Sequence, residues 1–285
     1  MKISVSSYCF NQYLKSGKME LIDTVAKAHE IGFEAIEFLD MPGNTQEERL
    51  EYAKKIRAEA DRLGMVINAY TIGANLYRET PEECDAEVKH LCEKVDIAKA
   101  LGCSVMRHDV CYKLGKTGNS RSFDLMLPTI AENARRITEY AATLGIKTCS
   151  ENHGYISQDS DRVERLFNAV NHDNFGLLVD IGNFACVDED SAKAVSRVAP
   201  YAIHVHAKDM HLSPVKKEGY GQTRGCNYFK GAILGEGNID VPKCLAILKR
   251  AGYDGYVSIE FEGSEDCIYG ISKGLEYLKE TINSL

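Results

Sequence analysis

Alternating polar side chains mark the segment YAIHVHAKDM, residues 201–210. Because neighbouring side chains of a strand point to opposite faces, His204, His206 and Lys208 share one face of this segment. Burying such a face is costly unless its polar groups have partners. The segment therefore predicts a polar site at the end of a buried strand.

Three other apolar runs end in acidic residues: Glu151 after IKTCS, Asp180 after GLLV and Glu260 after YVSI. With His206 they form a set of three carboxylates and one imidazole, which would repel strongly around one point without a cation. Oxygen-rich ligand sets with one histidine suit Mn²⁺, Mg²⁺ or Co²⁺, with Zn²⁺ as an alternative. We expect one divalent ion here, Mn²⁺ first. Taken singly, each acid is more typical of a solvated loop edge, and the histidine of a hydrogen-bonded core residue; the four together favour the metal site.

These residues can meet only in a fold that brings strand ends together. A repeated helix–glycine–strand connection predicts such a fold. Five amphipathic helical patterns each pass through a glycine into an apolar strand, as in AKALGCSVMRHD. A glycine just past a helix end adopts the left-handed conformation without a Cβ penalty. Repetition of this joint is typical of strand–helix units in a parallel α/β fold. The glycines are Gly32, Gly64, Gly102, Gly145 and Gly252.

Eight candidate strands follow from these joints, at 2–8, 33–39, 65–71, 103–110, 146–151, 176–181, 201–207 and 256–261. Helical patterns separate them at 19–31, 46–63, 83–101, 123–144, 160–171, 191–199 and 240–251, and a last one closes the chain. This alternation predicts an α/β fold, a (β/α)8 TIM barrel forming a single domain over residues 1–285, with a long loop after strand 7 and a C-terminal helix. A doubly wound open sheet is the alternative. Active sites of such barrels lie at the C-terminal strand ends.

Composition excludes several classes of function. A net charge of −8 in 285 residues argues against nucleic acid as a partner. The ten cysteines are scattered without a CxxC motif, which is typical of a reduced protein, so we expect a cytoplasmic location. The N-terminus lacks the features of a signal peptide, and no apolar run is long enough for a membrane helix, so no membrane partner is expected.

Four motifs in order, SENHG, VDIGNF, HVHAKD and VSIEFEG, resemble the sugar phosphate isomerase/epimerase superfamily with a xylose-isomerase-like TIM barrel. The resemblance covers nearly the whole chain. It implies one divalent metal held by Glu151, Asp180, His206 and Glu260. His206 is preferred over His204 as the ligand because it directly precedes AKD.

The resemblance implies a metal-dependent isomerase or epimerase of carbohydrate metabolism, acting on a keto sugar, polyol ketone or sugar phosphate. Glu151 and Glu260 would move the α-proton of the substrate through a metal-bound enediolate. Two departures favour an alternative, a lyase or dehydratase of a 3-keto sugar or keto-glycoside, including glycoside-cleaving members. Asn183 stands where sugar 3-epimerases tend to carry a histidine, and the ENHG form makes His153 a further acid/base or a loop residue. Remote alternatives are an apurinic endonuclease, which would need more histidines at strands two and three, and a non-catalytic sugar-binding protein.

Strand parity gives further candidates for contact with a small carbohydrate substrate. We expect three of them near the barrel mouth: Glu37, Arg107 and Lys208. If the alternation of inward and outward side chains is offset by one residue, His108 takes the place of Arg107. The segment 211–240 is too long for a simple connection, so Arg224 and Lys230 could close over a substrate. The same segment could instead be a mobile surface loop or a contact in a homo-oligomer.

Overall fold

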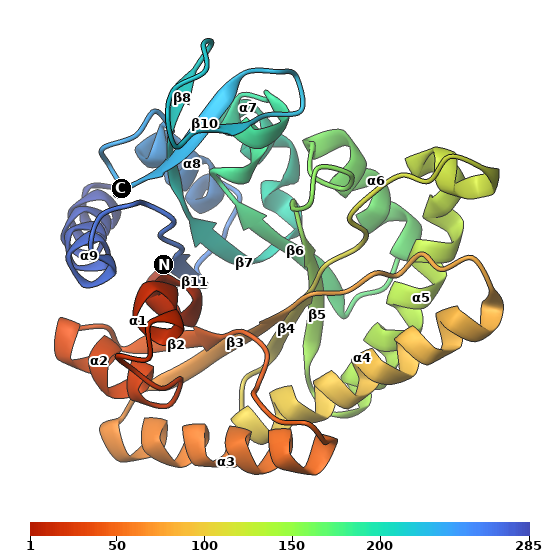
Figure 1. Cartoon of the computed structure of the whole chain (residues 1–285), viewed down its shortest axis with the longest axis horizontal. Coiled ribbons are helices and arrows are strands. Elements are labelled where there is room, and N and C mark those ends of the chain that lie inside the picture. The colour runs from red at the N-terminus through yellow and green to blue at the C-terminus, as the bar shows by residue number, and fades with distance from the viewer.

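A closed barrel of parallel strands forms the centre of the computed structural model, which describes every residue from Met1 to Leu285 (Figure 1). The strands are β1 (Lys2–Ser6), β2 (Ala35–Phe38), β3 (Val66–Ile72), β4 (Val105–His108), β5 (Lys147–Glu151), β6 (Phe175–Asp180), β7 (Ala202–Ala207) and β11 (Tyr256–Ile259). Strand β1 pairs with both β2 and β11, which closes the barrel. The predicted TIM barrel is confirmed, and the open sheet is excluded.

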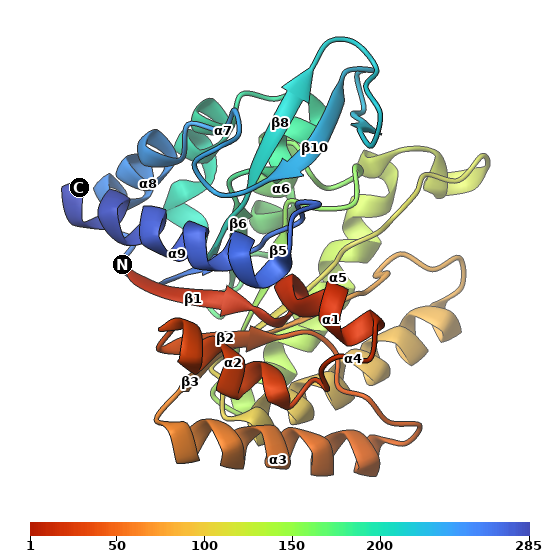
Figure 2. The same cartoon turned by 60° about the vertical axis from the view of Figure 1, so that its left-hand side comes forward.

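Helices surround the barrel and lie close to the predicted ranges (Figures 1 and 2). They are α1 (Asn11–Lys15), α2 (Asp23–Ile31), α3 (Gln46–Leu63), α4 (Pro81–Leu101), α5 (Phe123–Thr143), α6 (Ser160–Val170), α7 (Ser191–Val198), α8 (Val241–Arg250) and α9 (Cys267–Ser284). Only the short α1 was not predicted. Thr45 and Thr80 begin α3 and α4 with capping boxes, and the predicted glycine joints follow, as at Gly64 (φ 69°).

Residues 209–232 differ from the predicted loop. They form an antiparallel sheet of β8 (Asp209–Ser213), β9 (Gly221–Gln222) and β10 (Tyr228–Ala232), which projects beyond the barrel above β6 and β7 (Figure 2). The buried carboxylate of Asp209 holds the base of this sheet, because it accepts hydrogen bonds from the backbone of Gly235, Gly237 and Ile239 at 2.9–3.0 Å. This part of the barrel rim is therefore ordered structure.

Alternation along the strands places polar side chains inside the barrel. Val205 of β7 and Ile259 of β11 belong to the apolar cluster between barrel and helices. On the opposite faces, His204, His206 and Ser258 are buried in the barrel interior. None of the helices combines the length and apolar character needed to cross a membrane.

Candidate metal centre

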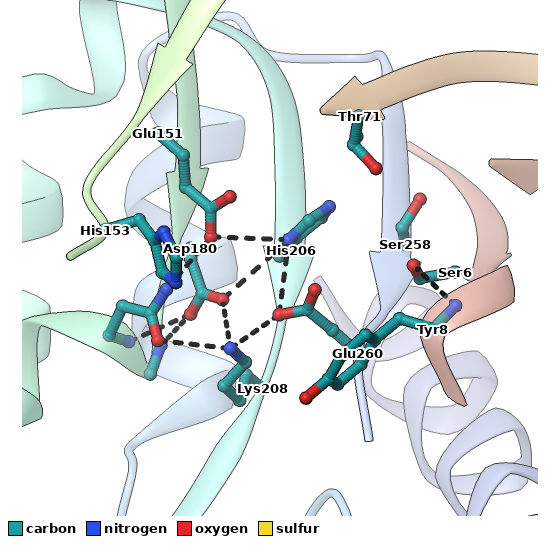
Figure 3. A network of polar contacts seen from close by, with 12 residues as sticks. Ser6, Tyr8, Thr71, Glu151, His153, Asp180, His206, Lys208, Ser258 and Glu260 are labelled. Atoms are coloured by element: carbon teal, nitrogen blue, oxygen red, sulfur yellow. Dashed lines mark hydrogen bonds and ion pairs between the residues drawn. The ribbon is translucent and has the colours of Figure 1, made fainter. Parts of the chain in front are cut away.

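Glu151, Asp180, His206 and Glu260 converge at the C-terminal ends of β5, β6, β7 and β11 (Figure 3). One ligand atom from each lies within 4.8 Å of the others. Nδ1 of His206 is central: it lies 3.7 Å from Glu151, 3.8 Å from Asp180 and 3.6 Å from Glu260. The structure thus brings together the four residues that the strand ends pointed to.

Two buried atoms of this cluster that form no hydrogen bond suit a divalent cation. Oδ2 of Asp180 and Nδ1 of His206 are buried and form no hydrogen bond. An unsatisfied buried polar atom costs free energy, and a buried carboxylate costs more. A bound cation would satisfy both atoms at once, and three carboxylate oxygens with one imidazole nitrogen are a donor set that suits Mn²⁺, Mg²⁺, Co²⁺ or Zn²⁺.

Strand register sets the height of these ligands. Asp180 of β6 pairs with His206 of β7, whereas Glu151 of β5 pairs with Leu178, and Glu260 lies two residues beyond Ser258, the partner of His206 in β11. Asn152 follows β5 and clamps the end of β6: its side chain accepts from Asp180 N at 2.8 Å and donates to Asp180 O at 2.9 Å. The ligand spacing is therefore a property of the rigid barrel rather than of loops.

Lys208 provides the nearest positive charge. Its Nζ lies 2.5 Å from Glu260 and 3.2 Å from Asp180, and it donates a hydrogen bond to Asn183 (Figure 3). Burial would lower the pKa of Lys208, but Asp180 and Glu260 hold this pKa well above its usual value. The side chain is therefore a permanent cation beside the ligands.

The pKa values of the four candidate ligands differ because each has different charged neighbours. Burial and the carboxylates of Glu151 and Glu260 raise the pKa of Asp180 to about 6. Burial also acts on Glu260, but Lys208 and His206 hold its pKa well below the usual range. The pKa of His206, which burial would lower, is held well above its usual value by Glu37 and Glu260. In the metal-free protein, Asp180 and His206 are therefore the ligands that bind protons most readily.

A second group of charges lies on the Glu151 side of the mouth. Arg107 forms an ion pair with Glu151 and lies 3.3 Å from Asp109. Asp109 in turn lies 2.9 Å from Nδ1 of His153 and accepts a hydrogen bond from Tyr112 at 3.0 Å. Despite burial, Arg107 and His153 hold the pKa of Asp109 at about 2. Asp109 is thus an anion that orients the histidine.

His153 reaches solvent, since 43% of its side chain is exposed. Burial would lower the pKa of His153, but the hydrogen bond to Asp109 and the charge of Glu151 raise it. The protonated ring is therefore more stable than it is in a free histidine. This is the condition required of a general acid.

The other predicted substrate contacts are placed differently. Glu37 is fully buried below the ligands, because it contacts His204 and His206 inside the barrel. His108 is also fully buried, and its ring centroid lies 6.2 Å from that of Phe175. Arg107, and not His108, therefore faces the site, where it contacts Glu151. The structure therefore argues against substrate contact by Glu37 and His108.

The predicted rim residues lie on the added sheet or beside it. Arg224 is exposed and paired with Asp159 at 2.8 Å, and it also donates to the backbone oxygen of Tyr155. Lys230 is half-buried on β10, where it pairs with His211 of β8. Neither side chain contacts a metal-ligand candidate, so their role in binding substrate stays a prediction.

Sequence reasoning missed Asn183 as a site residue. Its side chain donates to Glu151 at 2.9 Å and accepts from Lys208 at 3.1 Å, so it links the two groups of charges. Its backbone N–H also donates to Asp180. The signal was present in VDIGN, because an aspartate can accept a hydrogen bond from the backbone two residues further on, and Asp180 Oδ1 does so from Gly182 and Asn183.

Comparison with known proteins places this geometry in context. A family model described as xylose isomerase-like TIM barrel matches residues 25–281. The chain is similar to the inosose dehydratase of Clostridium perfringens, at 25% identity over 163 residues and 54% of each protein. It is similar to the inosose dehydratase of Yersinia enterocolitica at 27% over 198 residues, 65% of each. The chain thus spans between half and two thirds of these curated relatives.

Two solved structures share the fold over almost their whole length. D-psicose 3-epimerase from Clostridium cellulolyticum has a TM-score of 0.75 at 15% identity, covering 99% of both chains. The IolI protein with a bound zinc atom has a TM-score of 0.75 at 17% identity, covering 100% of this chain and 99% of the other. At these identities the likeness is one of fold.

Proposed function

Because this chain belongs to the xylose isomerase-like TIM barrel family, we propose that it is a divalent-metal-dependent dehydratase of a polyol ketone or keto sugar. Sequence analysis put an isomerase or epimerase first and a lyase second. The similarity to two inosose dehydratases reverses this order. The observation that carries the proposal is the placement of His153 and Glu260 on opposite sides of Asp180 (Figure 3). His153 is paired with Asp109 at 2.9 Å, and Glu260 lies 3.6 Å from His206.

Glu151, Asp180, His206 and Glu260 would hold the ion, with Mn²⁺ as the first expectation and Zn²⁺ supported by the IolI neighbour. When bound, the ion supplies a Lewis acid that polarises the substrate carbonyl and makes the adjacent C–H more acidic. Lys208 and Arg107 balance the remaining carboxylate charge.

Loss of water from such a ketone needs a base and an acid. Glu260 takes the proton from the carbon next to the carbonyl, and the electrons of that C–H bond form a carbon–carbon double bond as the neighbouring C–O bond breaks. His153 gives its proton to the departing hydroxyl, which leaves as water. Asp109 keeps the ring oriented, and its negative charge stabilises the protonated form of His153.

The charges of the mouth favour an uncharged substrate. Three cations in or near the mouth already have a carboxylate partner: Arg107 has Glu151, Lys208 has Glu260, and Arg224 has Asp159, whereas Lys230 on the projecting sheet forms no ion pair. A phosphate or carboxylate group gains most from unpaired cations such as a bidentate arginine. We therefore place neutral polyol ketones, including inososes, before sugar phosphates.

An isomerase or epimerase is the second candidate. Glu151 and Glu260 are both carboxylates at the mouth, and each lies within 4 Å of His206 Nδ1, at 3.7 and 3.6 Å. Two such groups on different sides of a substrate can remove a proton from one face and return it to the other. Both candidates begin with the same proton transfer, so the product separates them.

Incubating the metal-loaded protein with an inosose in heavy water, followed by mass spectrometry, tests the proposal. We expect a product lighter than the substrate by one water molecule. Deuterium at the α-carbon of a stereoisomer without loss of water would favour the second candidate. If protein shown to contain metal produces neither change with any of a panel of polyol ketones, both candidate functions are contradicted.

A matched pair of histidine variants sharpens this test. His153→Asn should lower dehydration about 10²–10⁴-fold, as expected for loss of a general acid, and leave metal content unchanged. His90→Asn, at an exposed position of α4, should leave dehydration unchanged. Equal activity of the two variants would remove His153 from the mechanism.

A further inference from the structure

Glu37 is a buried carboxylate whose only charged or titratable partners are two imidazoles. It is 0% exposed, and it lies 2.8 Å from Nε2 of His206 and 2.5 Å from Nε2 of His204. No lysine or arginine pairs with it. Taking an isolated carboxylate out of water is costly, so this charge must be balanced through the two histidines.

The two nitrogens of His206 face different surroundings. Nδ1 points to the three carboxylates of the candidate metal centre, at 3.6–3.8 Å. Nε2 faces Oε1 of Glu37, and neither of these two atoms has another hydrogen-bonding partner. A carboxylate can only accept, so its presence favours the tautomer of His206 with the proton on Nε2.

Glu37 is fixed in the barrel interior by the pairing of β2, where it lies opposite Ser6 of β1. Because side chains alternate along a strand, Glu37 and Ser6 share the inner face with His204 and His206 of β7. On its other side, Oε2 of Glu37 faces His204, whose Nε2 is also 3.4 Å from Ser258 Oγ, so the carboxylate is held from two directions.

We infer that Glu37 is a positioning residue of the metal centre: it keeps the proton on Nε2 of His206 and so presents Nδ1 to the ion. The inference rests on the metal centre of the proposed function and deepens it. Glu37 acts on the metal only through the histidine. Partners of this kind raise the basicity of a ligating histidine and fix its orientation, and losing one typically weakens metal binding about 10–100-fold.

Glu37→Gln tests this inference with little change in size. An amide offers one acceptor oxygen instead of two, so it cannot accept from both histidines. We expect Zn²⁺ affinity, measured by competition with a chromophoric chelator, to fall about 10–100-fold. Asp40→Asn is the matched control, because Asp40 lies just beyond β2 but pairs with Lys94 and Tyr70, away from the ligands.

A folded Glu37→Gln variant that binds Zn²⁺ as tightly as the Asp40→Asn control would overturn the inference while leaving the proposed function intact. A wild-type protein that binds no divalent ion would overturn both. Circular dichroism of each variant shows whether it is folded.

Nuclear magnetic resonance of the wild-type protein provides a second test that needs no variant. With ¹⁵N-labelled histidine, addition of Zn²⁺ should shift the Nδ1 signal of His206 while its Nε2 keeps the proton. Coordination through Nε2, or loss of the Nε2 proton when Zn²⁺ is added, would overturn the inference even if Glu37→Gln did not fold.

Discussion

The two halves of the barrel contribute differently to the mouth. Strands β5, β6, β7 and β11 end in the four candidate ligands. Strands β2 and β4 carry no candidate ligand, yet each sends one charged side chain to a ligand of the other half: Glu37 to His206 and Arg107 to Glu151. One half would therefore bind the metal, and the other would set the charge and orientation of its ligands.

This division explains how a buried cluster of acids is tolerated. Arg107 pairs with Glu151, and Lys208 lies 2.5 Å from Glu260 and 3.2 Å from Oδ2 of Asp180, which forms no hydrogen bond. A bound divalent cation would balance the carboxylate charge that these two side chains leave. Changes in the ligand half should accordingly cost the most metal binding and activity, whereas changes in the supporting half should weaken metal binding or lower stability.

The largest effect is expected in the ligand half, from Glu260→Gln. It removes a ligand and the proposed base, so activity should fall about 10²–10⁴-fold or more, and the metal should bind less tightly. Steady-state kinetics and metal analysis of the purified variant measure both. Glu276→Gln, on the exposed surface of α9, serves as the control. Near-normal turnover by Glu260→Gln would contradict the assignment of the metal ligands and the base to the half formed by β5, β6, β7 and β11.

Arg107→Met tests the supporting half. It leaves Glu151 and Asp109 buried without their guanidinium, so the metal-free protein should lose about 3–5 kcal/mol of unfolding free energy in urea. Arg224→Met breaks an ion pair with the arginine 39% exposed and should cost less than about 1 kcal/mol. Similar losses from the two variants would mean that the pairing of Arg107 adds nothing beyond a surface contact.

Proton release connects the two halves. In the metal-free protein the pKa of Asp180 is raised to about 6, chiefly by burial, and the pKa of His206 is raised above its usual value by Glu37 and Glu260. Both raised groups hold protons that a metal must displace, so affinity should fall as the pH falls through 6. Calorimetry in buffers of different ionisation enthalpy should detect more protons released at pH 5 than at pH 8. Affinity and proton release that do not change with pH would contradict the assignment.

The smallest effect is expected from Tyr112→Phe. Its hydroxyl donates to Asp109 and accepts from Ala74 N at 3.1 Å, but the side chain touches no candidate ligand. Losing it should cost about 0.5–1.5 kcal/mol of stability and leave metal affinity unchanged. Thermal unfolding with and without metal would measure both. A large loss of metal affinity would show that residues without direct contact to a candidate ligand also position the ligands.

Much of this arrangement could be read from the sequence because it follows strand periodicity. Glu151, Asp180, His206 and Glu260 each come at the end of an apolar run, and parallel strands bring such ends together. The antiparallel sheet at 209–232 was not foreseen, since its strands are short and both β9 and β10 contain a glycine.

Glu37 shows why parity alone was insufficient. Its position two residues before the end of the predicted strand 33–39 suggested the mouth, but the contacts with His204 and His206 place it deeper. Alternation tells which face of a strand a side chain occupies, but not its depth in the barrel. Asn183 was noticed only as a departure from a family pattern, because its contacts with Glu151 and Lys208 depend on the three-dimensional path of a turn.

Metal content of the purified protein tests the central claim most directly. Mass spectrometry should find about one divalent ion per chain, as expected for a single four-ligand site. Asp180→Asn should abolish this binding, whereas Asp40→Asn should retain it. No metal in the wild-type protein, even after loading with Mn²⁺, Co²⁺ or Zn²⁺, would contradict the account, and two or three ions per chain would point instead to a metal cluster.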